Sequence, residues 1–587
     1  MNTNSMSSIP NTKTANLCNL IPAPFRLRQA FILGAGFCMA FFMMPHLGQA
    51  ASVWEGSVSQ SWLDAGNWSS APSWNNTTDL EFNASSSNSS TSSPSFLGSA
   101  RTVRSIAFGA DADTDLMILL ATTAADTTAA NAQMGSNTGT ASIVVNAGAT
   151  GNFQLGNAQG VLRLDSNLLV DHSGSGNLTI RAISVPGAGQ IKYITKNGSG
   201  TLVLGVGGAI NYLYQGGLVL NSGTVITRNN GSTLGTTAAT LALNGGVLKF
   251  MHSGDTNFGR NTTVSGDSKI ITSNFSGGAG LLYTLGTLAI GSQELSVEGA
   301  GYASGNGQVT FGATTLTGNA VLNVTKPSSG TGATNLNLAA VGDGGLGYGL
   351  TKNGNGNLTV NGTSTFTGQA FVNAGRLIIG TAGAMNSASS VSVASGAALT
   401  NSNSSTALTT AMILNSGAVL SGAGSFAPVS MTLVADLAGG NASFSSISAG
   451  ATNLAKSGAM EFTLSNITDG SYVIFSGSAL SGSFSSVTVG GTALADLGSG
   501  NFGGTAGGFD YAFTNSTNTL GITTVPEPTT WVLLGLGGVF LIFRVQSLVI
   551  TPFQNSWCSN SGNSTRTARW WSRWLVTINP AAKPFIF

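Results

Sequence analysis

Thr195-Lys196-Asn197-Gly198-Ser199-Gly200-Thr201-Leu202-Val203-Leu204 is the stretch that decides the fold, because residues 351–360 repeat its pattern as T-K-N-G-N-G-N-L-T-V. Further along the chain each copy ends in an Asn-x-Gly element, at residues 221–223 and 373–375. The shared register is T-K-N-G-x-G-x-L-x-[LV], with a middle of variable length. A variable middle is what a loop on one side of a repeated array tolerates.

The Asn-x-Gly element also recurs without the rest of the pattern. It is preceded each time by Val or Leu, at residues 145–148, 220–223, 243–246, 372–375 and 414–417. Apolar residues alternate with polar ones around it, which is typical of a half-buried strand, and Asn-x-Gly indicates a tight turn with positive φ. Strand, turn and strand in repetition predict the coils of a β-solenoid.

Stacking explains the composition of these coils. A rung of four or five residues cannot bury its apolar side alone, but stacked rungs share one continuous core. We expect the turn asparagines to hydrogen-bond to their equivalents on neighbouring rungs. Like charges on stacked rungs would lie about 4.8 Å apart, which disfavours charge. A β-sandwich or blade array is the alternative, although its hairpins would be spaced more regularly.

The two long copies resemble the autotransporter-associated β-strand repeat, over residues 194–226 and 350–379. This resemblance implies a right-handed parallel β-helix in a large secreted or surface protein. Together with the alternation it predicts an all-β body over residues 101–424. Residues 425–524 lack the opening pattern, and we expect a C-terminal β-region or cap there.

Composition limits the function classes. Only 7% of the residues are charged, against roughly 25% in average domains, and 81 are Gly, yet 42% are hydrophobic, which disfavours disorder. All acidic residues lie between Glu55 and Glu527, and both ends are purely basic. An acidic body argues against a nucleic-acid partner. The cysteines (Cys18, Cys38, Cys558) lie outside the body, which therefore has no disulfide and no thiolate.

The first 50 residues are typical of a secretory signal peptide. Basic residues precede an apolar run at residues 30–44, and Gly48 and Ala50 supply the small residues of a cleavage site. We expect signal peptidase to cut after Ala50, so that the mature chain starts at Ala51. An uncleaved membrane anchor is the alternative.

Pro526-Glu527-Pro528 precedes an apolar run at residues 531–543 and then Arg544. The prolines cannot lie inside a helix, so a single transmembrane helix is expected to begin after them, with Arg544 retained on the inner side. Residues 525–544 resemble the PEP-CTERM sorting signal of Gram-negative bacteria that make extracellular polysaccharide. The alternative is a Pro-Glu-Pro linker before a chance hydrophobic run.

That resemblance implies an exosortase-type membrane protease as partner, a transient stay in the inner membrane, and release to the cell surface or extracellular matrix. Family members usually stop soon after the basic residues, but residues 545–587 continue as an acid-free, tryptophan-rich extension. It is either a basic-aromatic segment on the cytoplasmic membrane surface or the product of a frameshift, and we favour the frameshift.

Residues 51–100 begin the mature chain with a tryptophan-rich segment and a Ser-rich loop. Trp54, Trp62, Trp68 and Trp74 lie in it, with Trp62 and Trp68 in a W-x-D-x-x-N-W pattern. Exposed indoles stack on sugar rings, so these residues are candidate glycan contacts. A solenoid also needs an end cap, and four tryptophans suit one. We favour the cap.

We find no convincing catalytic or metal-binding set in the sequence. His172 and His252 are expected to be solvated loop residues, and Asp111, Asp113 and Asp115 lack the rest of a calcium loop. Glu294 and Glu298 are expected to flank a turn. We therefore expect no cofactor, no metal and no enzymatic activity.

The sequence thus predicts an exported structural protein of the cell surface or extracellular matrix. One alternative is an adhesin that binds extracellular polysaccharide through the tryptophans. A second is a polysaccharide-degrading β-helix enzyme, which would need a cluster of acidic and basic residues on one face.

Overall fold

The computed structural model describes residues 50–59, 61–83, 101–118, 132–156, 161–187, 190–206, 212–228, 231–300, 302–327, 332–450, 452–477 and 480–526. Most of the expected signal peptide, the sorting segment after Pro526 and the whole extension 545–587 lie outside these residues. In the described part of the chain, no helix is both long enough and apolar enough to span a membrane.

Strands dominate the described residues, and the only helical elements among them are two short 3-10 turns, η1 (Ala65–Asn67) and η3 (Gly440–Ala442). Three long sheets run along the chain. Sheet I contains, in spatial order, β1 (Ser52–Val53), β2 (Asp79–Phe82), β4 (Ser105–Phe108), β7 (Thr140–Val145), β10 (Asn167–His172), β13 (Tyr193–Asn197), β15 (Gly217–Leu220), β17 (Thr240–Leu243), β20 (Asn261–Val264), β23 (Leu288–Ile290), β26 (Thr314–Leu316) and β29 (Val341–Gly342).

Sheet II is open, with β5 and β46 as its edge strands. It contains β5 (Leu116–Ile118), β8 (Phe153–Leu155), β11 (Asn177–Ile180), β14 (Thr201–Leu204), β16 (Thr224–Arg228), β18 (Val247–His252), β21 (Ser268–Asn274), β24 (Glu294–Ala300), β27 (Ala320–Thr325), β30 (Leu350–Asn353), β32 (Ala370–Val372), β34 (Ser390–Val393), β36 (Ala411–Asn415), β38 (Ser430–Asp436), β41 (Ala459–Ser465), β45 (Ser486–Val489) and β46 (Thr492–Ala493).

Sheet III contains β19 (Thr256–Asn257), β22 (Leu282–Thr284), β25 (Gly307–Phe311), β28 (Thr334–Leu338), β31 (Asn357–Val360), β33 (Arg376–Ile379), β35 (Ala398–Asn401), β37 (Val419–Ser421), β39 (Ile447–Gly450) and β43 (Phe475–Gly477). Near the N-terminal end a smaller sheet holds β12 (Ile183–Ser184), β9 (Leu162–Leu164), β6 (Ala132–Met134) and β3 (Arg101–Val103). β40 (Leu454–Lys456) pairs with β44 (Leu480–Gly482).

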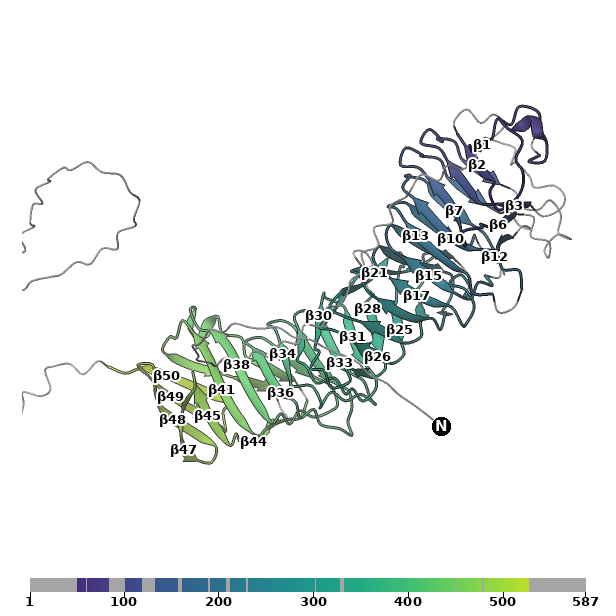
Figure 1. Ribbon diagram of the computed structural model, residues 1–587. Helices are drawn as coiled ribbons and strands as arrows, with labels where there is room; N and C mark the ends of the chain where they lie inside the picture. The colour runs from purple at the N-terminus through teal and green to yellow at the C-terminus, as the bar shows by residue number, and fades with distance from the viewer. Residues whose placement is uncertain are drawn as a thin grey trace, which may run out of the picture. The chain divides into compact units, whose positions relative to one another are not determined.

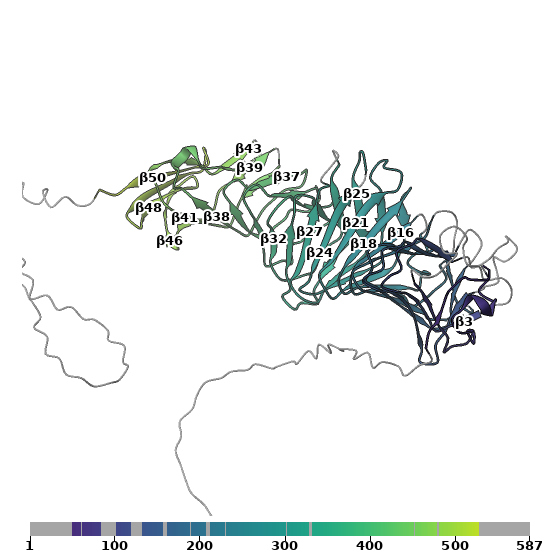
Figure 2. The same cartoon turned by 90° about the horizontal axis from the view of Figure 1, so that it is seen from above.

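Except for the antiparallel pair β45–β46, strands within the long sheets pair in parallel with the next turn of the chain, which makes a β-solenoid of about 15 turns. In sheet I, for example, Lys196 faces Leu220, and Leu220 faces Leu243. Figure 1 shows β13, β15 and β17 side by side in chain order, and Figure 2 shows the same for β16, β18 and β21. The predicted solenoid is confirmed, and parallel pairing rules out the hairpin-based sandwich.

Alternation along each strand builds the core. In β18, Leu248 and Phe250 are buried while Val247 and Lys249 are only partly so. Stacking then places buried Leu, Ile and Val side chains above one another, in one continuous core. Each fully buried side chain of this size contributes roughly 1.5–3 kcal/mol.

The Asn-x-Gly elements lie at the corners between sheets. The predicted asparagine ladder is confirmed: Asn221 Nδ2 donates to Asn197 Oδ1 at 2.8 Å, and Asn244 Nδ2 donates to Asn221 Oδ1 at 2.8 Å. The equivalent bond joins Asn373 to Asn353 at 2.9 Å. These bonds satisfy the amides along the stack.

The two T-K-N-G segments form corners of the same geometry, but between different pairs of sheets. The first joins β13 of sheet I to β14 of sheet II, and the second joins β30 of sheet II to β31 of sheet III. Gly198 and Gly354 both have φ of 75°, so the corner geometry is shared. The repeat therefore specifies a corner rather than a particular face.

Parallel stacking continues beyond residue 424 to β45, so the expected change of architecture at residue 425 comes later in the chain. The strands β38 and β41 keep the inside–outside alternation without the T-K-N-G opening. An antiparallel terminal sheet then follows, in the order β42 (Gly470–Val473), β50 (Thr519–Thr524), β49 (Phe509–Thr514), β48 (Asn501–Ala506) and β47 (Ala495–Gly498).

Candidate functional site

The tryptophans expected to be glycan contacts lie at the N-terminal end of the core. Trp54, Trp62 and Trp68 are buried, with at most 4% of their surface exposed, and Trp74 is partly exposed. Trp54 and Trp68 meet edge to face at 5.0 Å, and Trp62 stacks on Trp74 at 6.2 Å. Protein atoms cover the faces of the three buried indoles. The expected glycan contact is therefore corrected for Trp54, Trp62 and Trp68, because none of them has a ring face open to a sugar.

The indoles close the end of an aromatic column. Trp62 packs on Phe82 at 5.6 Å, Phe82 stacks on Phe108 at 5.8 Å, and Phe108 stacks on Phe153 at 4.0 Å. Because these phenylalanines come from successive rungs, the tryptophans cover what would otherwise be an open end of the core. The arrangement is that of an end cap.

Asn67 explains the polar residues of the W-x-D-x-x-N-W pattern. Its buried side chain accepts bonds from the backbone N–H groups of Val58 and Ser59, both at 2.8 Å. It also donates to Ser59 Oγ and to Ser61 O, both at 2.9 Å. The amide therefore ties the loop around the indoles together.

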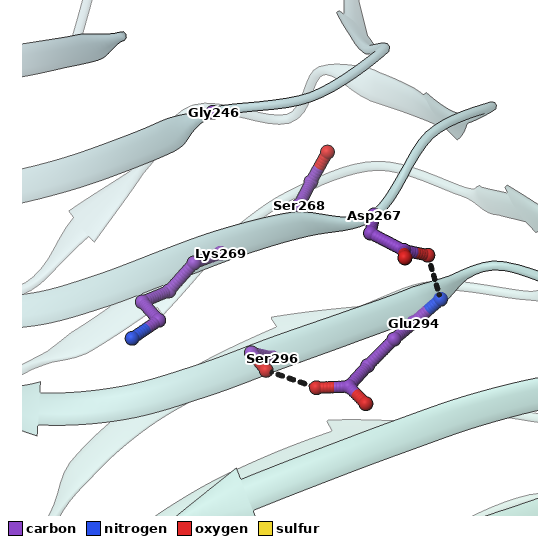
Figure 3. A pocket seen from close by; sticks show the side chains of 6 residues that line it. All are labelled: Gly246, Asp267, Ser268, Lys269, Glu294 and Ser296. Carbon is purple, nitrogen blue, oxygen red and sulfur yellow. Dashed lines mark hydrogen bonds between the residues drawn. The ribbon is translucent and has the colours of Figure 1, made fainter. Parts of the chain in front are cut away.

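A polar pocket of about 300 Å³ lies on the outer side of sheet II (Figure 3). Its lining comes from three successive rungs, those of β18, β21 and β24. The lining residues are Gly246, Asp267, Ser268, Lys269, Glu294 and Ser296.

Neutral donors hold the two carboxylates of this pocket. The backbone N–H of Glu294 donates to Asp267 Oδ1 at 2.8 Å, and Ser296 Oγ donates to Glu294 Oε1 at 2.6 Å (Figure 3). Asn323 Nδ2 adds a bond to the same Glu294 oxygen at 3.0 Å. The pocket can accept hydrogen bonds from a ligand through Asp267 and Glu294, and Lys269 in its lining can donate them.

The sequence suggested that Glu294 and Glu298 flank a turn, but they do not. Both lie on β24, on its outer side, with Leu295 and Val297 buried between them. Glu298 forms an ion pair with Lys269 at 3.0 Å, and both side chains are more than a third exposed. The strand extends through both residues because its alternation is unbroken.

The aspartates and histidines within the described residues form no metal site. Across the residues that the structure describes, no group of three or more His, Cys, Asp or Glu side chains is placed to hold a metal ion. Asp115 instead accepts bonds from the backbone and side chain of Asn152, at 2.8 and 3.0 Å.

The expectation of solvated histidines is wrong. His172 and His252 occupy buried positions at the ends of β10 and β18, with 0% and 2% of their surface exposed. His252 bonds to Thr227 Oγ1 at 3.0 Å and to Thr256 Oγ1 at 3.1 Å, whereas neither ring nitrogen of His172 has a partner among the described residues. Both strands run further than the sequence suggested, which carries the histidines inside.

Acid should destabilise the solenoid through these histidines. The pKa of each is lowered to about 4, by burial for both and, for His172, also by the nearby charge of Lys196. Between pH 6.5 and 4 the unfolded chain binds protons that the folded chain does not, so the free energy of unfolding falls as the pH falls, by about 3 kcal/mol for each histidine. Denaturant unfolding of wild type and His252→Gln across this window measures the difference in slope. Equal slopes would contradict the prediction.

Two buried lysines were missed by the sequence interpretation. Lys196 Nζ donates to the carbonyl oxygens of Asn197, Gly198 and Ser222, and Lys352 Nζ donates to those of Asn353, Gly354 and Ala374. Both side chains are fully buried.

Burial lowers the pKa of both lysines to about 8, so the ammonium form still predominates at pH 7. The signal was present in the sequence. In each repeat the lysine stands two positions before Gly198 or Gly354, at an alternation position that points inward.

The terminal antiparallel sheet leads directly to the expected sorting residues. β50 ends at Thr524, whose N–H donates to Asp469 Oδ1 at 2.7 Å, and the Val525 N–H donates to Gly508 O at 3.0 Å. Residues 524–546 match the family model of the PEP-CTERM protein-sorting motif. The PEP-CTERM motif thus begins at the last residue of the last strand.

The PEP-CTERM motif includes Pro526, Glu527, Pro528 and Arg544; of these, only Pro526 lies within the described residues. The motif supports an exported protein that is sorted by an exosortase-type system and passes through a membrane before release. No curated protein and no solved structure matches the chain. Signal cleavage between Ala50 and Ala51 stays a prediction, and Gly48 lies outside the described residues.

Proposed function

We propose that the protein is a non-enzymatic structural component of the cell surface or extracellular matrix. The observation that carries this proposal is the position of the PEP-CTERM motif, which starts where the folded body ends at Thr524. Removal of the tail after Pro526 would release the complete solenoid and its terminal sheet. The folded body, and no partial fragment of it, is then the exported product.

The construction of the body supports a structural role. Each rung contacts mainly its neighbours, so stability accumulates along the stack. A tryptophan cap covers the N-terminal end, and Lys456 Nζ binds Asn515 O and Asn518 Oδ1 at 2.9 and 2.7 Å, which ties the solenoid to the loops of the terminal sheet. Such a body needs no disulfide in an oxidising compartment.

The same corner geometry at Lys196 and Lys352 supports the proposal that both segments are copies of one autotransporter-associated repeat. The burial of three of the four tryptophans favours a cap over a glycan contact at that end. The pocket at Asp267 and Glu294 offers hydrogen-bond acceptors, and we propose no catalysis there.

Changing the sorting residues should retain the protein in the membrane. In Pro526→Ala/Glu527→Ala/Pro528→Ala we expect loss of the released form, because the processing enzyme would no longer recognise the junction. Intact mass and terminal sequencing of protein from cells and medium measure this, with Pro186→Ala as control. The wild-type product should start at Ala51 and end near Pro526.

Two results would contradict the proposal. A released wild-type protein that still ends at Phe587 would show that the tail is not removed. Cleavage of a polysaccharide by the purified protein, lost in Asp267→Asn/Glu294→Gln, would show that the body is an enzyme.

A further inference from the structure

Sheet III presents a regular, uncharged hydrogen-bonding surface over three successive rungs. On β25, β28 and β31 the outward residues form two columns, and the residues between them (Val309, Leu336 and Leu358) are buried. One column is Gln308, Asn335 and Asn357, and the other is Thr310, Asn337 and Thr359. We call these six residues the amide–hydroxyl face.

One strand of the neighbouring sheet II carries charge at this level of the solenoid, whereas the outward residues of β27 and β30 are uncharged. On β24 of sheet II the outward residues include Glu294 and Glu298. On the amide–hydroxyl face no outward residue of the three rungs is charged, and the next rung adds only Arg376. Alternation does not require outward residues to carry amide groups, and four of the six residues of this face are Asn or Gln.

The side chains of the face are partly fixed by one another. Asn357 Nδ2 donates to Asn335 Oδ1 at 2.9 Å, and Asn337 Nδ2 donates to Thr310 Oγ1 at 3.2 Å. The Asn335 nitrogen and the Asn337 oxygen form no further hydrogen bond within the described residues. Each rung therefore keeps donors or acceptors available, in side chains that have already lost part of their conformational freedom.

We propose that the amide–hydroxyl face binds a neutral polysaccharide that lies along the stacking axis. A chain of hydroxyl groups both donates and accepts hydrogen bonds and carries no charge, which matches the face. Rungs repeat about every 4.8 Å, and an extended pyranose chain repeats at a similar interval. Each exposed hydrogen bond adds little net free energy, so affinity must accumulate over several rungs.

This inference deepens the proposed function by naming a matrix ligand, and it rests on that function only for the location of the protein. Binding by the purified chain is independent of processing. Failure to bind would therefore leave the sorting experiment untouched, and failed processing would leave the binding result untouched.

Isothermal titration calorimetry of the purified full chain with β-1,4-linked glucose oligosaccharides tests the proposal. We expect the hexasaccharide to bind at least tenfold more tightly than the disaccharide, and polygalacturonate to bind more weakly than the neutral chain. The variant Asn335→Ala/Asn337→Ala/Asn357→Ala/Thr359→Ala should bind the hexasaccharide at least tenfold more weakly.

The matched control changes outward residues of sheet II on the adjoining strands β27 and β30. Val321→Ala/Thr325→Ala/Thr351→Ala should bind like wild type. If the first variant does not fold, Thr310→Ala/Thr359→Ala should weaken binding about threefold. Equal loss in the control, affinity independent of chain length, or equal binding of polygalacturonate would overturn the proposal. So would a change in self-association, seen by sedimentation, without oligosaccharide binding.

Discussion

Replacing Gly375 with alanine is expected to destabilise the neighbouring rungs by about 3 kcal/mol. Gly375 has φ of 65°, a conformation that costs other residues roughly 1–2 kcal/mol. An added Cβ would also lie 2.5 Å from Gly356 O and 2.6 Å from Gly354 O, so the adjacent rung would have to move. Hydrogen exchange in β31, β33 and β35 measures the local loss of protection, and denaturant unfolding measures the total.

Gly396, the corner glycine of the next rung, is the matched control. Its φ of 73° is similar, but nothing lies within 4 Å of an added Cβ. Gly396→Ala should therefore cost only the backbone penalty of about 1 kcal/mol. Equal destabilisation by the two substitutions would show that close stacking at Gly375 contributes nothing.

Replacing Lys352 with methionine is expected to lower the free energy of unfolding by about 2 kcal/mol. The ammonium group donates to Asn353 O at 2.7 Å, Gly354 O at 2.8 Å and Ala374 O at 3.1 Å. Methionine fills much of the same volume and avoids burying a charge, but it leaves three converging carbonyl groups without a donor. We expect the loss of these donors to outweigh the gain from removing the buried charge.

Lys326→Met, at an exposed lysine, is the control and should change stability by less than about 0.5 kcal/mol. Denaturant unfolding at pH 7 compares both variants with wild type. A Lys352→Met variant as stable as wild type would mean that the ammonium serves no purpose in closing the corner.

Much of the fold was predictable from local patterns. Alternation around the Asn-x-Gly elements predicted short strands, and the asparagine ladder followed from stacking them. The Asn-x-Gly turn implied positive φ, which is found at Gly223, Gly246, Gly375 and Gly417. The parallel strands run on past residue 425, because β38 and β41 keep the alternation after the repeat opening disappears.

The candidate site was predicted less well. The sequence of an aromatic segment at the end of a solenoid does not show whether its rings face solvent or the core. The burial of Trp54, Trp62 and Trp68 was therefore established only by the structure. The sequence interpretation placed a turn between Glu294 and Glu298, whereas both lie on strand β24. The amide–hydroxyl face was not foreseen, because its columns form from residues more than 20 positions apart in the chain.

By itself the sequence determined the all-β solenoid, the glycine corners and the sorting motif, because strand alternation, positive φ and a linear signal are local properties. Only the tertiary structure decided which rungs are neighbours, which sheets each T-K-N-G corner joins, which carbonyl groups of the next rung bind Lys196 and Lys352, and that His172 and His252 are buried. The physical reason is that side chains alternate between the core and the outer surface with a period of two along one strand. Register between strands, and the enclosure of a polar group at a corner, depend on contacts with the next turn of the chain.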